Sequence, residues 1–262
     1  MLAGRVAGLR YGWRALPVLV VLLGIWELYV DLGGADPLIL PPPHAVASAL
    51  YTDRALLWSN FLVTAQEILI GIAISAVVGL AFSISLHFSP RTLRPAVYPL
   101  LVASQAVPIA LLAPILVLWL GFGLLSKIVV IAIVCFFSIV VTTLADLGSV
   151  DPDLIKLMRT LDATRLQTFR YVEFPSALPG VLTGSKIAVV VAPIAAVLAE
   201  QAGSSAGLGY VFTEANNQLL TARMCAAVAI LAAFAITLFV LLTLAERLAV
   251  PWVRQPPIEN AA

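Results

Sequence analysis

Residues 203–207 match a motif that carries the nucleophile of many serine hydrolases. They read Gly-Ser-Ser-Ala-Gly, the G-x-S-x-G pattern, with Ser205 in the nucleophile position. Such a serine needs a histidine base, and in hydrolases with this motif the histidine follows the serine in the chain. The two histidines of this sequence, His44 and His87, both precede Ser205. We therefore expect a glycine-rich turn here rather than a catalytic centre, so no catalytic residue is predicted.

Other reactive patterns are missing from the sequence. It has no G-x-x-x-x-G-K-[ST] phosphate loop and no H-E-x-x-H zinc motif. Cys135 and Cys225 stand alone in apolar stretches without a C-x-x-C spacing, which favours two small buried side chains over a disulfide or a metal site. We predict that the chain holds no metal and no cofactor, and that any ATP involved is bound by another polypeptide.

Several polar residues fall inside strongly apolar stretches, where an ionised side chain costs about 2.5–3.5 kcal/mol at the centre of a bilayer. Gln105 and Glu200 are the candidates for contact with a solute, because Gln105 precedes Pro108 and Glu200 borders the glycine-rich turn. Hydrogen bonding between helices is the alternative for both. Lys186 is expected to snorkel or to pair within a helix bundle, and Glu67 is a further polar residue at this depth.

The composition shows that the elements holding these residues are membrane helices. Of the 262 residues, 61% are apolar and 11% are charged, whereas a soluble domain carries about 25% charged residues. Neither a soluble globule nor a disordered chain fits these values. The net charge of +1 gives no reason to expect nucleic acid as a partner. We predict an all-α polytopic membrane protein.

Six apolar segments are long enough to be considered as membrane spans. They are Leu16–Val30, Phe61–His87, Ala96–Leu120, Leu125–Leu147, Leu178–Glu200 and Cys225–Val250. The predicted domains are a cytoplasmic tail at 1–15, one six-helix membrane domain at 16–250 that includes a cytoplasmic loop at 151–175, and a cytoplasmic tail at 251–262.

The distribution of lysine and arginine predicts the orientation. With the N-terminus in the cytoplasm, twelve basic residues lie on the inner side and three on the outer side. The inner residues are Arg5, Arg10, Arg14, Arg91, Arg94, Lys156, Arg159, Arg165, Arg170, Lys186, Arg247 and Arg254, and the outer ones are Arg54, Lys127 and Arg223. We therefore expect both termini in the cytoplasm. The first span also resembles a signal peptide, but Glu27, Tyr29 and Asp31 favour a retained helix.

The loop at 151–175 is too patterned for a simple linker. Asp151 can cap a helix that begins at Pro152, and Leu154, Leu157 and Leu161 then fall on one face. A second short helix is expected to begin after Thr164, which can form a capping box with Gln167, and to end at Pro175. Spacing alone leaves two interpretations open. The loop is either a rigid protrusion for a partner or an amphipathic hairpin on the inner leaflet.

This loop resembles the cytoplasmic EAA loop of permease subunits of ABC importers, in particular the nitrate, sulfonate and taurine branch. The similarity is carried by residues 159–169, which read RTLDATRLQTF, and 172–180, which read VEFPSALPG. Supporting segments are Trp26-Glu27-Leu28 with the downstream Leu-Pro-Pro-Pro at 40–43, residues 119–123, and Ala199–Tyr210. The resemblance covers most of the chain.

The resemblance implies a type I importer permease in a bacterial inner membrane. Two permease subunits, expected to be two copies of this chain in a homodimer, would pair in the bilayer and take solute from an extracytoplasmic binding protein. The loop of each would dock on a cytoplasmic ATP-binding subunit as a coupling helix. The residues that would make this contact are Leu161, Asp162, Ala163, Thr164, Arg165, Leu166, Gln167 and Thr168.

The loop departs from the family pattern at two places. Lys156, Leu157 and Met158 stand where the family has Glu-Ala-Ala, and Asp162 stands where it has glycine at the turn. A positive φ costs a non-glycine residue about 1 kcal/mol, and aspartate is among the residues that tolerate it best. We therefore expect the turn to form with Asp162.

The sequence thus predicts the permease subunit of an ATP-driven importer for a small polar solute. Residues 200–210 and 215–219 are most similar to permeases for the hydroxymethylpyrimidine precursor of thiamine, with sulfonate, taurine or nitrate as alternatives. A secondary transporter, which needs no ATPase, and an intramembrane serine hydrolase are the alternatives from other classes.

Overall fold

A computed structural model describes residues 7–90 and 92–251, and no β-strand occurs in these ranges. The helices are α1 (Ala7–Asp31), α2 (Pro43–Thr52), α3 (Arg54–Phe88), α4 (Leu93–Ser104), α5 (Ile109–Leu120), α6 (Leu124–Gly148), α7 (Pro152–Thr160), α8 (Arg165–Thr168), a π-helical turn η2 (Phe169–Glu173), α9 (Phe174–Gln201), α10 (Leu208–Asn217) and α11 (Thr221–Ala249). Arg5, Arg91, Arg254 and most of the predicted tails lie outside the described residues.

Within the part of the chain that the structure describes, four helices are long and apolar enough to cross a bilayer by themselves. They are α3, α6, the continuous helix Arg165–Gln201 and α11, and their most apolar windows have a mean hydropathy of 2.1–2.9. They correspond to the second, fourth, fifth and sixth predicted spans. The first predicted span, Leu16–Val30, is helical within α1, which begins at Ala7. Because α1 is not among the helices long and apolar enough by this measure, the count of six spans stays a prediction.

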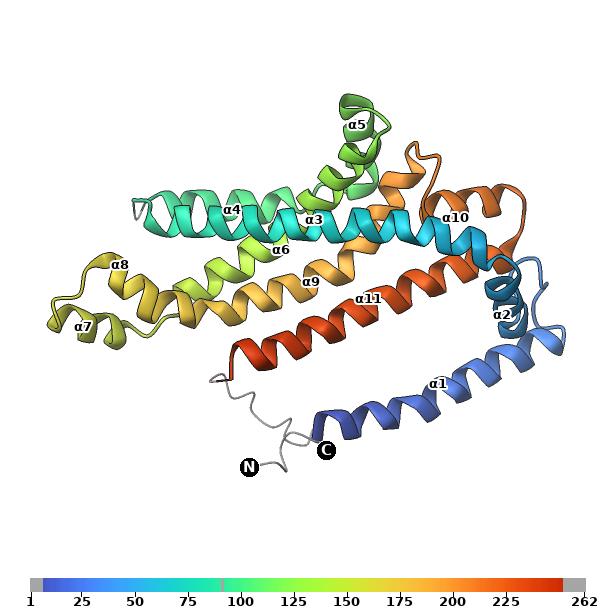
Figure 1. Cartoon of the computed structure of the whole chain (residues 1–262), viewed down its shortest axis with the longest axis horizontal. Helices are drawn as coiled ribbons and strands as arrows, with labels where there is room; N and C mark the ends of the chain where they lie inside the picture. Colours follow the sequence, from blue (N-terminus) through green and yellow to red (C-terminus); the bar gives the residue numbers. More distant parts are fainter. Residues whose placement is uncertain (1–6, 91, 252–262) are drawn as a thin grey trace.

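The third predicted span is not a continuous helix. Ala96–Leu120 was expected as one segment, but it divides into α4 and α5, whose axes are bent by 94°. The break falls at residues 105–108. Pro108 causes it, because proline has no N–H to donate and disfavours a helical conformation in the residue before it. As Figure 1 shows, α5 projects away from α4 and from the long axis of the bundle.

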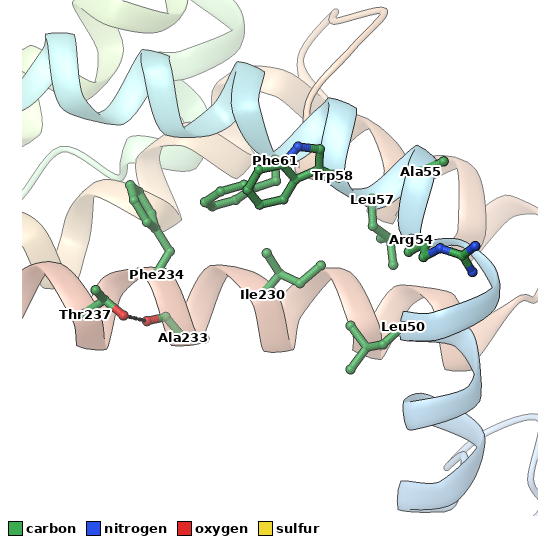
Figure 2. Close-up of a pocket in the computed structure, with 10 residues that line it drawn as sticks. All are labelled: Leu50, Arg54, Ala55, Leu57, Trp58, Phe61, Ile230, Ala233, Phe234 and Thr237. Atoms are coloured by element: carbon green, nitrogen blue, oxygen red, sulfur yellow. Dashed lines mark hydrogen bonds between the residues drawn. The ribbon is translucent and has the colours of Figure 1, made fainter.

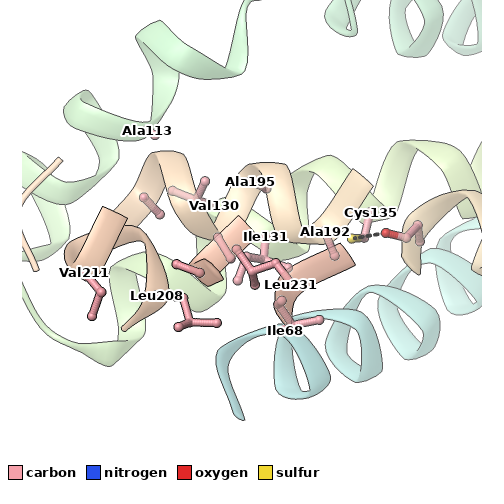
Figure 3. Packing of buried hydrophobic residues seen from close by; sticks show 14 of the residues in the cluster. Ile68, Ala113, Val130, Ile131, Cys135, Ala192, Ala195, Leu208, Val211 and Leu231 are labelled. Atoms are coloured by element: carbon pink, nitrogen blue, oxygen red, sulfur yellow. Dashed lines mark hydrogen bonds between the residues drawn. The ribbon is translucent and has the colours of Figure 1, made fainter. Parts of the chain in front are cut away.

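The centre of the bundle is the contact of α6 with α9 and α3. Small residues of α9 face this contact, and all five are fully buried: Ala188, Ala192, Ala195, Ala196 and Ala199. They lie opposite larger side chains such as Val130 and Ile131 of α6 and Ile68 of α3 (Figure 3). Without a hydrophobic driving force between helices in lipid, such small residues stabilise the pair by letting two backbones approach closely.

The expected break at Pro175 is absent. The segment predicted as a separate short helix runs through α8 and η2 into α9 without interruption. The N–H of Phe174 donates to the carbonyl of Phe169, which is the wide hydrogen bond of a π-turn. Pro175 directly follows this π-turn, where the wider turn lets the helix continue past a residue that has no N–H to donate. The loop predicted at 151–175 is therefore continuous with α9.

A substitution at Gly184 of α9 tests how closely α6 and α9 approach each other. A Cβ atom there would lie 2.3 Å from Thr142 Oγ1 and 2.7 Å from Ile139 Cα. We expect Gly184→Ala to lower the free energy of unfolding by about 1–3 kcal/mol through overpacking. Thermal unfolding of the purified protein in detergent measures the effect. Gly24→Ala is the matched control, since a Cβ at Gly24 meets nothing within 4 Å. Equal melting temperatures for the two variants would contradict this account of the packing.

Candidate functional site

The hairpin, which we define as α7, α8 and the turn between them (residues 152–168), begins as the sequence predicts. The Asp151 carboxylate accepts a hydrogen bond from the N–H of Asp153 at 2.9 Å, and Pro152 is the first helical residue. This cap satisfies one of the free N–H groups at the start of α7. The predicted helix start is therefore confirmed.

The turn of the hairpin is held by hydrogen bonds at both of its ends. The N–H of Ala163 donates to the carbonyl of Met158 at 3.0 Å, which closes α7. Asp162 has a φ of 52°, the left-handed conformation expected where the family pattern has glycine. Thr164 and Gln167 form the predicted capping box, with a 2.7 Å bond from the N–H of Thr164 to the Gln167 side chain. Although Asp162 has a side chain, the turn forms.

The tip of the hairpin exposes large apolar side chains. Leu161 and Leu166 are 68% and 67% exposed, and Leu157 of α7 is also exposed. Of the eight predicted coupling residues, Leu161–Thr168, only Thr168 is buried and only Ala163 is half-buried. Apolar side chains on an ordered, projecting turn are typical of a surface that contacts another molecule.

An aromatic cluster connects the root of the hairpin, by which we mean η2 (Phe169–Glu173), to α3. Phe88 at the end of α3 contacts Phe169 of η2, with ring centroids 4.9 Å apart, and Phe169 contacts Phe174 at 5.8 Å. Leu147 of α6 and Ala177 of α9 complete the buried group. Phe169 of η2, next to the hairpin in the chain, therefore packs against residues of α3, α6 and α9.

Polar contacts reinforce this root, and the sequence did not predict them. His87 Nε2 of α3 lies 2.8 Å from Glu173 Oε2 of η2, and both side chains are less than 15% exposed. Arg165 donates to the carbonyl of His87 at 3.3 Å, and its guanidinium is 5.0 Å from the centroid of the Phe88 ring. The sequence signal was slight: a histidine at the inner end of an apolar segment, 86 positions before its partner.

At the opposite end of the bundle, three side chains accept hydrogen bonds from the backbone N–H groups at the start of α10. The N–H groups of Gly207, Leu208 and Gly209 donate to Asn60 Oδ1 at 2.8 Å, Thr64 Oγ1 at 2.8 Å and Glu200 Oε2 at 2.5 Å. The first N–H groups of a helix have no partner within the helix, so they need external acceptors. The positive end of the α10 dipole also favours the nearby carboxylate.

Glu200 is enclosed by these contacts. Its residue exposure is 1%, and its Oε1 accepts a hydrogen bond from the Thr64 hydroxyl at 2.6 Å. A Cβ atom on Gly207, whose φ is 110°, would lie 2.3 Å from the Glu200 carboxyl carbon, so only glycine allows this approach. Glu200 thus makes the contact between helices that was the alternative to contact with a solute.

The other polar residues at membrane depth are distributed among different environments. Gln105 is exposed, in the break between α4 and α5. Lys186 pairs with Glu246 of α11 at 2.8 Å, which confirms the expected pairing within the bundle. Glu67 lies 3.0 Å from Lys127 of α6, with both side chains almost completely buried. The structure therefore does not bring Gln105 and Glu200 together into one site.

A cavity of about 750 Å³ lies between α3 and α11, apart from all these residues. Figure 2 shows that Trp58, Phe61, Ile230 and Phe234 line it, with Arg54 at one end. Neither Gln105 nor Glu200 contributes to it. This apolar groove is therefore not formed by the residues that were predicted to contact a polar solute.

A further polar contact fixes the corner between α1 and α2. The Glu27 carboxylate accepts a hydrogen bond from the backbone N–H of His44 at 3.2 Å and also contacts the His44 ring. The contact between the Glu27 carboxylate and the His44 ring raises the pKa of His44 above its ordinary value. Asp31 lies close by, with its carboxylate within 4.8 Å of the other two side chains. Capping of α2 by Glu27 accounts for the arrangement.

Comparisons with known proteins agree with this architecture. Residues 71–255 match the family described as binding-protein-dependent transport system inner membrane component. The formylaminopyrimidine transport permease ThiX of Halalkalibacterium halodurans is 36% identical over 89% of this chain and 93% of its own length. The taurine transport permease TauC of Escherichia coli is 31% identical over 91% of this chain and 89% of its own.

A solved structure with a similar fold comes from the inward-facing MetNI methionine ABC transporter. The TM-score is 0.63 at 20% identity, and the match covers 78% of this chain and 99% of that one. At this identity the likeness concerns the fold alone. It supports a type I importer permease fold for the helices described above.

Proposed function

Because the chain belongs to the family of inner membrane components of binding-protein-dependent transport systems, we propose that its cytoplasmic hairpin docks the ATP-binding subunit of an importer. The chain is the permease subunit of an ABC importer, a multi-pass membrane protein. Permeases of this family are transport subunits, and their ATPase is a separate subunit. This excludes the two alternatives from other classes, the secondary transporter and the serine hydrolase.

The observation that carries the docking proposal is the exposed apolar tip on a rigid support. Leu161 and Leu166 have no apolar contact that buries them, yet the turn between them is fixed by the capping box and by Asp162. An amphipathic hairpin lying on lipid would not need this rigid connection to the fifth span. A preformed, ordered tip instead lowers the entropy cost of binding to a cleft on another protein.

The root of the hairpin gives the coupling its physical basis. When ATP closes the ATP-binding subunits, the hairpin moves with them, and the His87–Glu173 contact and the phenylalanine cluster carry that movement to α3. The continuous helix from Arg165 to Gln201 carries the same movement along the fifth span. ATP drives the cycle because it binds the two conformations with different affinity.

The broken span supports a second permease subunit and a solute path. Residues 105–108 are exposed and non-helical within the third predicted span, and at membrane depth such backbone is tolerated only where protein or water covers it. We place this break against a second copy of the chain, in a homodimer whose central path includes Gln105. Both termini then lie on the cytoplasmic side of a bacterial inner membrane, in accordance with the excess of basic residues there.

The solute we propose is a pyrimidine precursor of thiamine. The support is the 36% identity to a permease named for formylaminopyrimidine, together with the similarity of residues 200–210 to permeases for the hydroxymethylpyrimidine precursor. Taurine, sulfonate or nitrate is the alternative, supported by the 31% identity to a taurine permease.

The docking proposal predicts that charge at the tip prevents assembly. In Leu161→Glu with Leu166→Glu, two carboxylates would have to be desolvated in the interface, so co-purification with the cognate ATP-binding subunit and ATP-driven uptake should both be lost. Asp162→Gly is the control, because glycine keeps the left-handed turn and should leave assembly and uptake intact. Normal assembly of the double variant, or its loss in Asp162→Gly, would contradict this account of the tip.

The path proposal predicts that position 105 is reached by water. A hydrophilic, membrane-impermeant thiol reagent should label Gln105→Cys in the assembled transporter, and transported solute should slow the labelling. Leu111→Cys on the apolar surface of α5, 66% exposed, is the matched control and should stay unlabelled. The unmodified chain gives the background from Cys225. Equal labelling of both variants, or no labelling at 105, would refute the path.

The substrate proposal predicts the specificity of the solute-binding protein that works with this permease. Calorimetric titration of that protein should show binding of a hydroxymethylpyrimidine or formylaminopyrimidine and none of taurine or nitrate. Binding of the anions instead would establish the alternative substrates.

A further inference from the structure

Lys127 links three parts of the outer end of the bundle, and the functions above leave it without a role. Its Nζ lies 3.0 Å from Glu67 Oε1 of α3 and donates a 2.6 Å hydrogen bond to the hydroxyl of Ser204. Lys127 itself is at the start of α6, and Ser204 is in the turn between α9 and α10. One side chain therefore connects α6, α3 and this turn.

The burial of the Lys127–Glu67 ion pair carries a desolvation cost. The Lys127 side chain is 9% exposed and the Glu67 side chain is 0% exposed. Within the described residues, Oε1 of Glu67 is paired with Lys127, Oε2 has no hydrogen-bond partner, and the Glu200 side chain lies close by. A buried ion pair is weak evidence for stability alone, because desolvation offsets much of the attraction. Ionisable groups at membrane depth are instead a signal of function.

The turn that Lys127 contacts through Ser204 also packs against the loop between α5 and α6. A Cβ atom on Gly203 would lie 2.3 Å from the ring of Phe122, in the loop between α5 and α6. The N–H of Ala206 donates to Ser204 Oγ at 3.2 Å, so the same hydroxyl organises the turn internally. Beyond the turn, Gly207 and Leu208 are bound to Asn60 and Thr64 of α3. The turn and the start of α10 thus move together with α3 and α6.

The same helices reach the hairpin at the opposite end. Residues 67 and 87 of α3 are separated by about 30 Å of helix. At the far end of that distance, His87 contacts Glu173 at the root of the hairpin. Figure 1 shows α3, α6 and α9 running side by side between α10 at one end of the molecule and the hairpin at the other. A displacement of the outer turn can therefore reach the hairpin through one packed unit.

We propose that Lys127 and Glu67, acting through Ser204, are positioning residues that transmit the docking of the solute-binding protein to the ATP-binding subunits. The inference rests on the proposed function, because it assumes an ATPase on the hairpin and a binding protein at the outer face. It adds the contact through which the outer event reaches the inner one. Energy for the transmission comes from the docking itself, since the ion pair only keeps the turn attached to α3 and α6.

The test measures ATPase activity of the full transporter in lipid vesicles, with and without its solute-loaded binding protein. Ser204→Ala removes the hydroxyl that Lys127 holds and leaves the Lys127–Glu67 pair in place. We expect its unstimulated activity to stay within about twofold of the parent and its stimulation by the binding protein to fall by about fivefold or more. Ser204→Thr, which keeps the hydroxyl, should restore the stimulation.

Two matched controls separate transmission from folding. Ser205→Ala changes the adjacent, exposed serine and should leave the stimulation unchanged. Lys127→Met should reproduce the loss, whereas Lys186→Met removes a half-buried lysine pair, 2.8 Å from Glu246, and should not. A merely structural role would lower unstimulated activity and assembly together, and it would affect both lysine variants.

Unchanged stimulation in Ser204→Ala would overturn the proposal, as would an equal loss in Ser205→Ala or Lys186→Met. If Lys127→Met does not assemble, Ser204→Ala and Ser204→Thr decide the matter. Co-purification of the ATP-binding subunit with each variant keeps this test separate from the proposed function. A Ser204→Ala transporter that binds its ATPase but keeps full stimulation refutes the transmission and leaves the docking on the hairpin standing.

Discussion

The structure depends on the requirement that polar groups inside a bilayer find partners within the protein. At one end of the bundle, Asn60, Thr64 and Glu200 accept hydrogen bonds from three successive N–H groups, 207–209, at the start of α10. Further along the bundle, Lys186 pairs with Glu246, and Lys127 pairs with Glu67. Each contact joins two different elements. The few polar residues of the chain therefore fix the arrangement of helices whose apolar surfaces alone would leave it poorly specified.

The same requirement explains why the two ends of the bundle differ. At the end that carries the glycine-rich turn, polar groups are hydrogen-bonded within the protein, as Glu200 is to Thr64 and Gly209. At the end proposed to face the cytoplasm, the hairpin leaves the apolar side chains of Leu161 and Leu166 exposed, which is costly unless a partner covers them. Small residues of α9 let α6 approach closely between the two ends. A permease that transmits a conformational change from one partner to another needs both features: closely packed helices at its centre and an exposed apolar tip that a partner can bind.

Local patterns in the sequence predicted most of the fold. Long apolar runs indicated α3, α6, α9 and α11, and cap residues indicated the hairpin, including the left-handed turn at Asp162. Each of these features depends on residues within a few positions of one another. The bend between α4 and α5 was missed although Pro108 was noted, because a proline can kink a membrane helix slightly or divide it, and the neighbouring helices decide which.

The polar contacts of the candidate site could not be predicted in the same way. His87 with Glu173, and Lys127 with Glu67 and Ser204, join elements far apart in the chain, and spacing within one helix carries no information about such pairs. Glu200 was singled out by its position, but its partners on α3 and α10 appeared only with the structure.

The central claim is that the tip of the hairpin is where the ATP-binding subunit docks. Hydrogen–deuterium exchange of the permease in lipid, with and without that subunit, tests it most directly. The account predicts that the backbone amides of residues 161–168 become protected when the subunit is added, more than those of any other cytoplasmic segment. Unchanged exchange at 161–168, with protection appearing elsewhere on the cytoplasmic side, would contradict it.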